Sequence, residues 1–228
     1  MTSPRVEWID AAQFLARAPL MAVATCLVVD LDDPDIAPAV LLAPTRLDLV
    51  DMARPLAGPR GYFLKRRSLL RSLVAVWTGG APDAVIVAHD ERGAPRVESL
   101  DASIFVSVAA RGPVACVAVA GKPLGVDLEL VEAPSEPVWE ALHPSERHAV
   151  EQRWRTGSDD VFRDVWIAKE AYLKMLGDGL KRDPATVSIH LEGDDSFSIE
   201  NRVAAGSGHY ATRDIGARKV RCAVFLSA

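Results

Sequence analysis

The stretch from Val161 to Leu180, VFRDVWIAKEAYLKMLGDGL, decides how the rest of the chain is interpreted. Its apolar residues recur with the 3.6-residue period of an amphipathic helix, which predicts a helix over Val161–Leu176. A glycine-rich sequence at Gly177–Gly179 then ends it. Lys169 lies in the middle of the apolar face, where a charge is costly unless it is paired or reaches water. Either its aliphatic stem packs along the core while its ammonium group stays in contact with water, or Lys169 belongs to a functional site.

Glu170 and Lys174 follow on the same helix, four residues apart, so they share one face. An ordinary surface pair of this kind stabilises a helix by only about 0.2–0.5 kcal/mol. The pair alone therefore does not distinguish a site from a solvated face.

A second acidic cluster lies upstream, in the predicted strand Pro123–Val131. Side chains alternate along a strand, so Asp127 and Glu129 point to the same face. Two neighbouring carboxylates repel each other, and a hard cation such as Mg²⁺ relieves that repulsion. The alternative is an acidic edge that faces solvent.

A basic helix is predicted over Gly61–Trp77. Its polar side carries Lys65, Arg66, Arg67 and Arg71 in a chain whose net charge is −5. A solvated basic face is one interpretation. An anion site for a phosphate-bearing ligand is the other, since the arginine fork matches phosphate oxygens.

The composition excludes several classes of protein. With 228 residues, 49% hydrophobic and 25% charged, the chain is predicted to form a globular core. The net negative charge does not indicate nucleic-acid binding, and no apolar run is long enough to span a membrane. The absence of a signal peptide and of paired cysteines predicts a cytoplasmic protein with reduced thiols. No histidine has a metal-ligand spacing.

The remaining pattern predicts alternating short elements. Two more helices are expected at Pro44–Pro55 and Leu142–Arg153, and Arg92–Pro95 is expected to turn. Strands are expected at Met21–Leu31, Ala84–His89, Ser103–Val108, Val114–Ala120, Thr186–Leu191, Ser196–Ile199, Gly208–Thr212 and Lys219–Leu226. Ser103–Val108 and Val114–Ala120 are expected to form an antiparallel hairpin joined by residues 109–113.

Two motifs together resemble the phosphopantetheinyl transferases. GVDLE at Gly125–Glu129 matches G-[VI]-D-x-E, and WIAKEAYLK at Trp166–Lys174 matches [FW]-x-x-K-E-[AS]-x-x-K. A glycine-bearing turn, GDGL at 177–180, follows as in that family. Either motif alone is weak, whereas both in this order form a specific signal.

The resemblance implies an α+β fold of the larger, single-chain subfamily, in which two similar halves form a pseudo-dimer. The expected halves are residues 1–120, with contacts to the nucleotide end, and residues 121–228, with the metal and catalytic motifs. A fused pseudo-dimer has less need of a partner, so a monomer is expected. FLKRRSLLR at Phe63–Arg71 and LHPSERHAVEQRW, which starts at Leu142, are similar to further helices of the family.

The implied reaction transfers the 4′-phosphopantetheine arm of coenzyme A to a serine of an apo acyl or peptidyl carrier protein. The resemblance assigns Mg²⁺ to Asp127, Glu129 and Glu170. Glu170 and Lys174 are the implied catalytic residues. The residues expected to contact coenzyme A are Arg67, Arg71, Arg111, Lys169 and Lys174.

One departure from the family pattern concerns the 3′-phosphate of coenzyme A. The family often has Ser-His before the second hairpin strand, where this chain has Ala109 and Ala110, followed by Arg111. Arg111 is expected to supply the missing charge. The alternatives are a degenerate member that binds coenzyme A or a carrier without transfer, a Mg²⁺-dependent diphosphate hydrolase, and a structural α+β domain.

Overall fold

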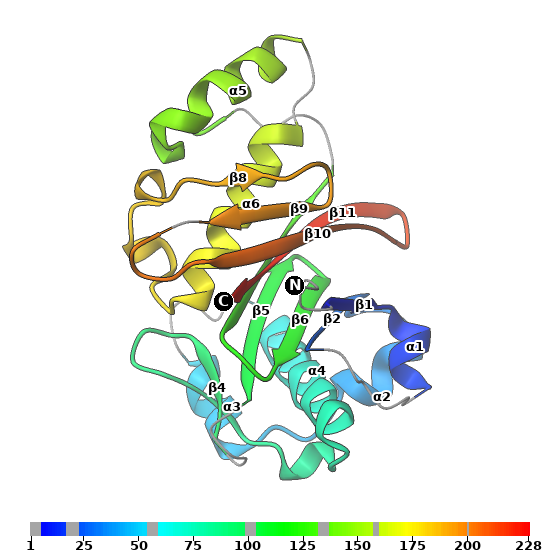
Figure 1. The fold of residues 1–228 in the computed structure, drawn as a ribbon. Coiled ribbons are helices and arrows are strands. Elements are labelled where there is room, and N and C mark those ends of the chain that lie inside the picture. Colours follow the sequence, from blue (N-terminus) through cyan, green and yellow to red (C-terminus); the bar gives the residue numbers. More distant parts are fainter. Residues whose placement is uncertain are drawn as a thin grey trace. The chain divides into compact units, whose positions relative to one another are not determined.

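Two β-sheets, each with one long helix on a face, organise the chain (Figure 1). The computed structural model describes residues 6–16, 23–53, 59–98, 104–131, 137–156, 160–199 and 201–228. It divides into unit 1, Met1–Pro123, and unit 2, Leu124–Ala228, whereas the sequence placed the boundary after residue 120. The mixed α+β class predicted from the sequence is confirmed. Within the described residues, no helix has the length and apolar character needed to cross a membrane.

Unit 1 is built on a four-stranded sheet with the order β1-β2-β6-β5, in which only β1 and β2 are parallel. Helix α4 packs on β6 and β5, and its buried leucines join the core of this unit. A separate hairpin joins β3 and β4. The elements are β1 Val6–Ile9, α1 Ala11–Leu15, β2 Ala24–Asp30, η1 Pro34–Ile36, α2 Ala37–Val40, α3 Arg46–Met52, α4 Arg60–Thr78, η2 Pro82–Ala84, β3 Val87–His89, β4 Pro95–Val97, β5 Phe105–Arg111 and β6 Val114–Ala120.

Unit 2 is built on an antiparallel sheet with the order β7-β11-β10-β9-β8. Helix α6 packs on β7 and β11, and α5 packs on α6. A core of aromatic and aliphatic side chains fills the space between α6 and the sheet. The elements are β7 Leu124–Leu130, η3 Trp139–Ala141, α5 Pro144–Arg155, α6 Asp160–Met175, η4 Gly179–Lys181, η5 Pro184–Thr186, β8 His190–Leu191, β9 Ser196–Ile199, β10 Gly206–Ile215 and β11 Arg218–Ser227.

The four predicted helices are confirmed, as is the antiparallel hairpin of β5 and β6. Several strand bounds differ from the prediction, and the predicted strand Ala84–His89 begins only at Val87. Strand β5 continues to Arg111, so the hairpin turn is shorter than expected, and most of the predicted strand Thr186–Leu191 is not a strand, because only His190–Leu191 pairs with β9. The predicted starts at Met21 and Ser103 and the predicted end at Pro55 lie outside the described residues.

Both long helices end at a glycine in the left-handed conformation. Gly79 has φ 71° after α4, and Gly177 has φ 72° after α6. Just after the end of α6, the N–H of Asp178 donates to the carbonyl of Leu173, which closes the last turn of the helix. The glycine-rich sequence therefore ends α6 as predicted.

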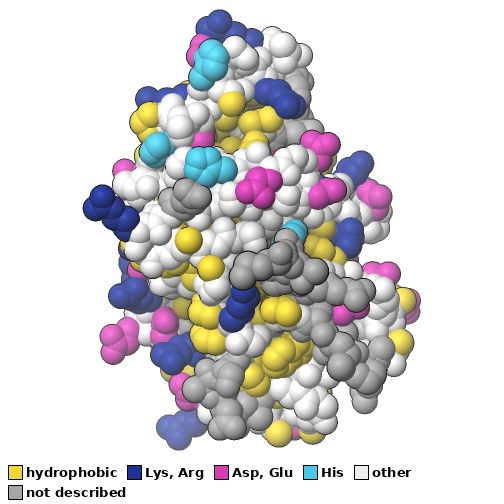
Figure 2. All heavy atoms as spheres, in the orientation of Figure 1, with side chains coloured by type: hydrophobic (Ala, Val, Ile, Leu, Met, Phe, Trp, Pro, Cys, Tyr) yellow, Lys and Arg dark blue, Asp and Glu magenta, His cyan; other side chains and the backbone are white. Residues whose placement is uncertain are grey.

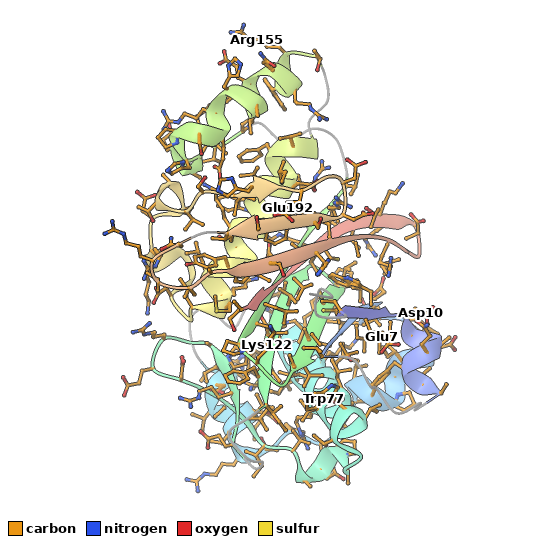
Figure 3. All side chains as sticks on the ribbon, viewed as in Figure 1. Glu7, Asp10, Trp77, Lys122, Arg155 and Glu192 are labelled. Atoms are coloured by element: carbon orange, nitrogen blue, oxygen red, sulfur yellow. The ribbon has the colours of Figure 1, made fainter. Side chains whose placement is uncertain are left out.

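Charges on the surface are mixed in sign, and the face in Figure 2 shows positive and negative side chains interspersed. Arg155 at the end of α5 points away from the body of unit 2 (Figure 3) and pairs with Glu151 at 2.5 Å. Such exposed pairs contribute little to stability. The ion pairs that bear on the candidate functional site are buried.

Candidate functional site

Strand β7 packs against helix α6 and brings Asp127 into contact with it. Gly125 lies so close to the helix that a Cβ atom added there would be 1.9 Å from the carbonyl oxygen of Ala171 and 2.6 Å from the amide nitrogen of Met175. Only glycine permits this approach, because both opposing atoms belong to the backbone. Asp127 follows on the same strand face and is only 1% exposed, so the solvent-facing acidic edge is excluded for this residue.

Asp127 pairs directly with Lys174 of α6. The distance between Lys174 Nζ and Asp127 Oδ1 is 2.6 Å. The carboxylate is buried, whereas the lysine side chain is 27% exposed and reaches the surface. The strand motif and the helix motif, 47 residues apart at this pair, are therefore in direct contact. Lys174 is thus not enclosed as a fully buried cation would be, and an ammonium group on a partly exposed side chain can also bind phosphate oxygens.

Glu170 lies one helical turn before Lys174 on α6 and is half-buried. Glu129 is half-buried near the end of β7, where it pairs in register with Arg221 of β11. The described residues contain no group of three or more His, Cys, Asp or Glu side chains that could hold a metal ion by themselves. Mg²⁺ is commonly held by one or two carboxylates together with phosphate oxygens of a substrate. Asp127, Glu129 and Glu170 therefore do not form a complete metal site by themselves, and Mg²⁺ would need further oxygens from a bound ligand.

Lys169 is buried on another side of α6 and is 1% exposed. Its Nζ is 2.7 Å from Glu146 Oε2 and donates to the carbonyl oxygens of Ala141 and Pro184, each at 3.0 Å. Desolvation lowers the pKa of Lys169, and the Glu146 carboxylate opposes that shift. An ammonium group has three N–H donors, and these three acceptors match them. The partner that the sequence requires for Lys169 is thus present within unit 2.

Two arginines of α4, Arg67 and Arg71, are also buried in ion pairs. Arg67 contacts Asp51 at 2.9 Å and Asp48 at 3.4 Å, and its side chain is 4% exposed. Arg71, with a side-chain exposure of 2%, contacts Asp48 at 3.4 Å. It also donates to the carbonyls of Ala43 and Val85 at 2.9 and 3.1 Å. These contacts give both arginines a structural task, and their predicted contact with a nucleotide stays a prediction.

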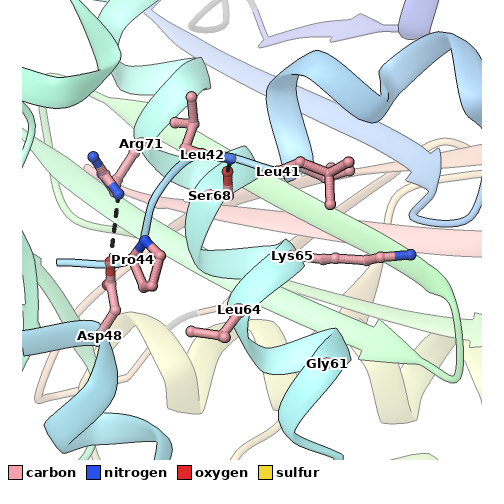
Figure 4. Close-up of a pocket in the computed structure, with 10 residues that line it drawn as sticks. Leu41, Leu42, Pro44, Asp48, Gly61, Leu64, Lys65, Ser68 and Arg71 are labelled. Atoms are coloured by element: carbon pink, nitrogen blue, oxygen red, sulfur yellow. Dashed lines mark hydrogen bonds and ion pairs between the residues drawn. The ribbon is translucent and has the colours of Figure 1, made fainter.

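A cavity of about 280 Å³ opens beside α4, and Figure 4 shows how its residues lie. Its wall is mainly apolar, and Arg71 points at Asp48 across one side of it. The lining residues are Val40, Leu41, Leu42, Pro44, Asp48, Gly61, Leu64, Lys65, Ser68 and Arg71. An apolar wall with its arginine already paired does not favour a phosphate site.

Arg111 ends β5 at the start of the hairpin turn and is exposed. Its Nη1 donates to the carbonyl of Ala110 at 3.2 Å. Ala109 is buried, so its methyl group belongs to the core rather than to a ligand site. Among the arginines predicted to contact coenzyme A, Arg111 is the exposed one.

Sequence reasoning missed the roles of Glu146 and Asp48. Each is the third residue of a helix and accepts a hydrogen bond from the backbone N–H of the residue before that helix: His143 for Glu146 and Thr45 for Asp48. The signal was present in the sequence, because Thr45–Asp48 follows the capping-box pattern. That pattern predicts the cap but not the buried cation on the same carboxylate.

Comparisons with known proteins identify a family for the region that contains β7 and α6. Residues 123–225 match the model of the 4′-phosphopantetheinyl transferase superfamily. A protein of Bacillus subtilis named 4′-phosphopantetheinyl transferase is 26% identical over 133 residues, which make up 58% of this chain and 59% of that protein. The matched family region corresponds to unit 2, which contains β7 and α6. The resemblance found in the sequence is therefore confirmed: residues 123–225 belong to the 4′-phosphopantetheinyl transferase superfamily.

Proposed function

We propose that this protein transfers the 4′-phosphopantetheine group of coenzyme A to a serine hydroxyl of an apo acyl or peptidyl carrier protein. The observation that supports this most directly is the contact between Asp127 and Lys174, at 2.6 Å, which joins the two family motifs. The superfamily match over residues 123–225 supports the reaction class. The carrier, the products and the metal dependence belong to the proposal.

The proposed step is a substitution at the phosphorus that carries the pantetheine arm. The serine oxygen forms a new P–O bond, the P–O bond to the nucleotide breaks, and adenosine 3′,5′-bisphosphate leaves. Glu170, half-buried on α6, takes the proton of the serine hydroxyl. Lys174 holds phosphate oxygens and balances the charge on the leaving group, because its ammonium reaches solvent beside Asp127.

Asp127, Glu129 and Glu170 are the residues that would hold Mg²⁺. The bound ion would supply neutralisation of the concentrated negative charge on the diphosphate. Arg111 is proposed to contact the 3′-phosphate in place of the absent histidine, since it is exposed and follows Ala110 directly. The pseudo-dimeric arrangement, a monomeric state and a cytoplasmic location are parts of the same proposal.

The test is a transfer assay with purified protein, coenzyme A, Mg²⁺ and a panel of apo carriers from fatty-acid, polyketide and peptide synthesis. The proposal expects one or more carriers to gain the mass of phosphopantetheine at the serine. No gain with any carrier, together with measurable coenzyme A binding, would favour the degenerate member that the Ala109–Ala110 sequence suggests. Release of free phosphopantetheine without a carrier would favour the diphosphate hydrolase.

A further inference from the structure

A buried polar cluster lies on the side of α6 away from β7, and it is built around Lys169. The ammonium of Lys169 bonds to Glu146 and to two backbone carbonyls, those of Ala141 and Pro184. Ala141 ends η3, the short helix before α5, and Pro184 begins η5, the second short helix after α6. One side chain of α6 therefore joins segments that precede and follow the helix.

Glu146 extends this cluster through both carboxylate oxygens. Oε2 accepts from the backbone N–H of His143 at 2.8 Å, and Oε1 accepts from the backbone N–H of Ile189 at 2.7 Å. Glu146 is 5% exposed, so these bonds lie in a low-dielectric interior, where they are strong and directional. The start of α5, the middle of α6 and the chain beyond α6 are thus held by one carboxylate–ammonium pair.

Helix α6 is held from the other side by β7. The helix advances 100° per residue, so Lys169 and Ala171 project about 200° apart, on nearly opposite faces. Ala171 meets Gly125 backbone to backbone, and Lys174 meets Asp127. The rotation of α6 is therefore defined by contacts on two opposite sides.

We propose that Glu146 and Lys169 are positioning residues, which fix the rotation of α6 so that Glu170 and Lys174 face β7. This inference rests on the proposed function, because it concerns the residues proposed for catalysis. In this role neither residue contacts a substrate. Lys169 had been expected to hold phosphate oxygens, and its burial together with its matched acceptors supports the positioning role instead.

Net stabilisation of the fold does not by itself account for an ion pair at this position. A buried ion pair contributes little net stability compared with apolar residues of similar volume, whereas breaking it by removing one partner is strongly destabilising. Changing both partners together separates the two effects. The double variant Glu146→Gln/Lys169→Met removes both charges and keeps the side-chain volumes close to the originals.

The experiment compares the double variant with the single variant Lys169→Met and with a control in unit 1, Asp48→Asn. Asp48 is equally buried and also caps a helix next to a buried cation. The double variant should regain the urea midpoint that Lys169→Met loses. Its kcat per folded molecule should stay lower by on the order of 10²-fold, because small displacements of reacting groups have effects of that size. The KM for coenzyme A should change little, and Asp48→Asn should keep its kcat.

Amide hydrogen exchange over α6 gives a second readout that needs no turnover. The double variant should exchange faster at residues 170–175, and Asp48→Asn should not. Wild-type kcat or unchanged α6 exchange in the double variant would overturn the positioning role, as would an equal loss of kcat in Asp48→Asn. Absence of transfer by the wild-type protein would instead reject the proposed function, and the exchange data would still decide the role of Glu146 and Lys169.

Discussion

The two units of this protein contain the same kind of buried ion pair, in which a carboxylate that caps a neighbouring helix contacts a cation of the long helix. In unit 1, Asp48 accepts from the Thr45 N–H and pairs with Arg71, which also donates to the carbonyl of Ala43. In unit 2, the corresponding residues are Glu146, His143, Lys169 and Ala141. Each residue of the second set lies 98 positions after its counterpart in the first. The constant spacing supports the two similar halves expected from the family resemblance.

The two long helices, α4 and α6, differ in the residues that follow the buried cation. At 98 positions before Glu170 and Lys174, α4 has Ser72 and Val76. Ser72 donates to the carbonyl of Ala39, and Val76 packs on the core of unit 1. Strand β2 has a single acidic residue, Asp30 at its end, whereas β7 has Asp127 and Glu129. The helix-capping carboxylate and its buried cation are thus common to both units, whereas the acidic residues proposed for the chemistry lie in unit 2.

The largest expected effect tests this difference between β7 and β2. Asp127→Asn should lower transfer by on the order of 10²-fold or more, because it removes the charge that faces Lys174 and one carboxylate of the proposed site. The rate of carrier modification at saturating coenzyme A measures the effect. Asp30→Asn on β2 is the matched control and should retain transfer. Equal losses in the two variants would show that the contrast between the strands has no functional meaning.

The close packing of β7 on α6 predicts the next effect. Gly125→Ala should destabilise the protein by about 1–3 kcal/mol and lower transfer, because the added methyl group meets backbone atoms that must move. Gly121→Ala is the control, since the nearest atom to its added Cβ is 3.9 Å away. Urea unfolding and the transfer rate check both variants. An unchanged unfolding midpoint for Gly125→Ala would contradict the backbone contact.

A smaller effect is expected at Arg111, which is proposed to take the place of the histidine in the family pattern. Arg111→Ala should weaken coenzyme A binding by about tenfold, the usual range for loss of a charge-assisted hydrogen bond. Coenzyme A without its 3′-phosphate is the matched ligand, and its Kd should be the same for the wild type and the variant. Calorimetric titration measures both. If the two ligands lose affinity equally, Arg111 does not recognise the 3′-phosphate.

The smallest effect is a pH dependence of stability from His209 in β10. Desolvation lowers the pKa of His209, and its Nε2 is buried without a hydrogen-bond partner in the described part of the chain. As the pH falls below about 6.5, the unfolded chain takes up the proton before the folded one, so stability declines.

The measurement is the urea midpoint at about pH 7.5 and about pH 5.5. The wild type should lose more stability between them than His209→Gln. The exposed His148 provides the control, because His148→Gln should follow the wild type. Identical pH slopes for wild type and His209→Gln would reject this contribution.

Much of the fold followed from the sequence because the long elements carry strong periodic patterns. Helices α4 and α6 and the hairpin of β5 and β6 could be predicted for that reason. Short elements such as β1 and α2, with four residues each, contain only two repeats of a strand pattern or about one turn of a helix. Their existence depends on pairing and packing with residues far along the chain, which no local pattern records.

The candidate site was predictable in part. The face shared by Asp127 and Glu129 follows from strand alternation, and the motifs associated β7 with α6. The burial of Lys169 could be inferred from its place in the apolar stripe, but its partner could not. Glu146 precedes it by 23 residues and lies in a different helix. A pairing across such a separation is decided by tertiary packing, so the sequence leaves open whether a ligand or a side chain meets the charge.

The most direct measurement of the central claim is the intact mass of an apo carrier protein after incubation with coenzyme A, Mg²⁺ and either Glu170→Gln or Ser72→Ala. These variants change residues 98 positions apart, one on each long helix. The account predicts that the carrier gains phosphopantetheine with Ser72→Ala and not with Glu170→Gln, although both variants remain folded. A normal gain with Glu170→Gln would contradict the assignment of the chemistry to the acids of unit 2.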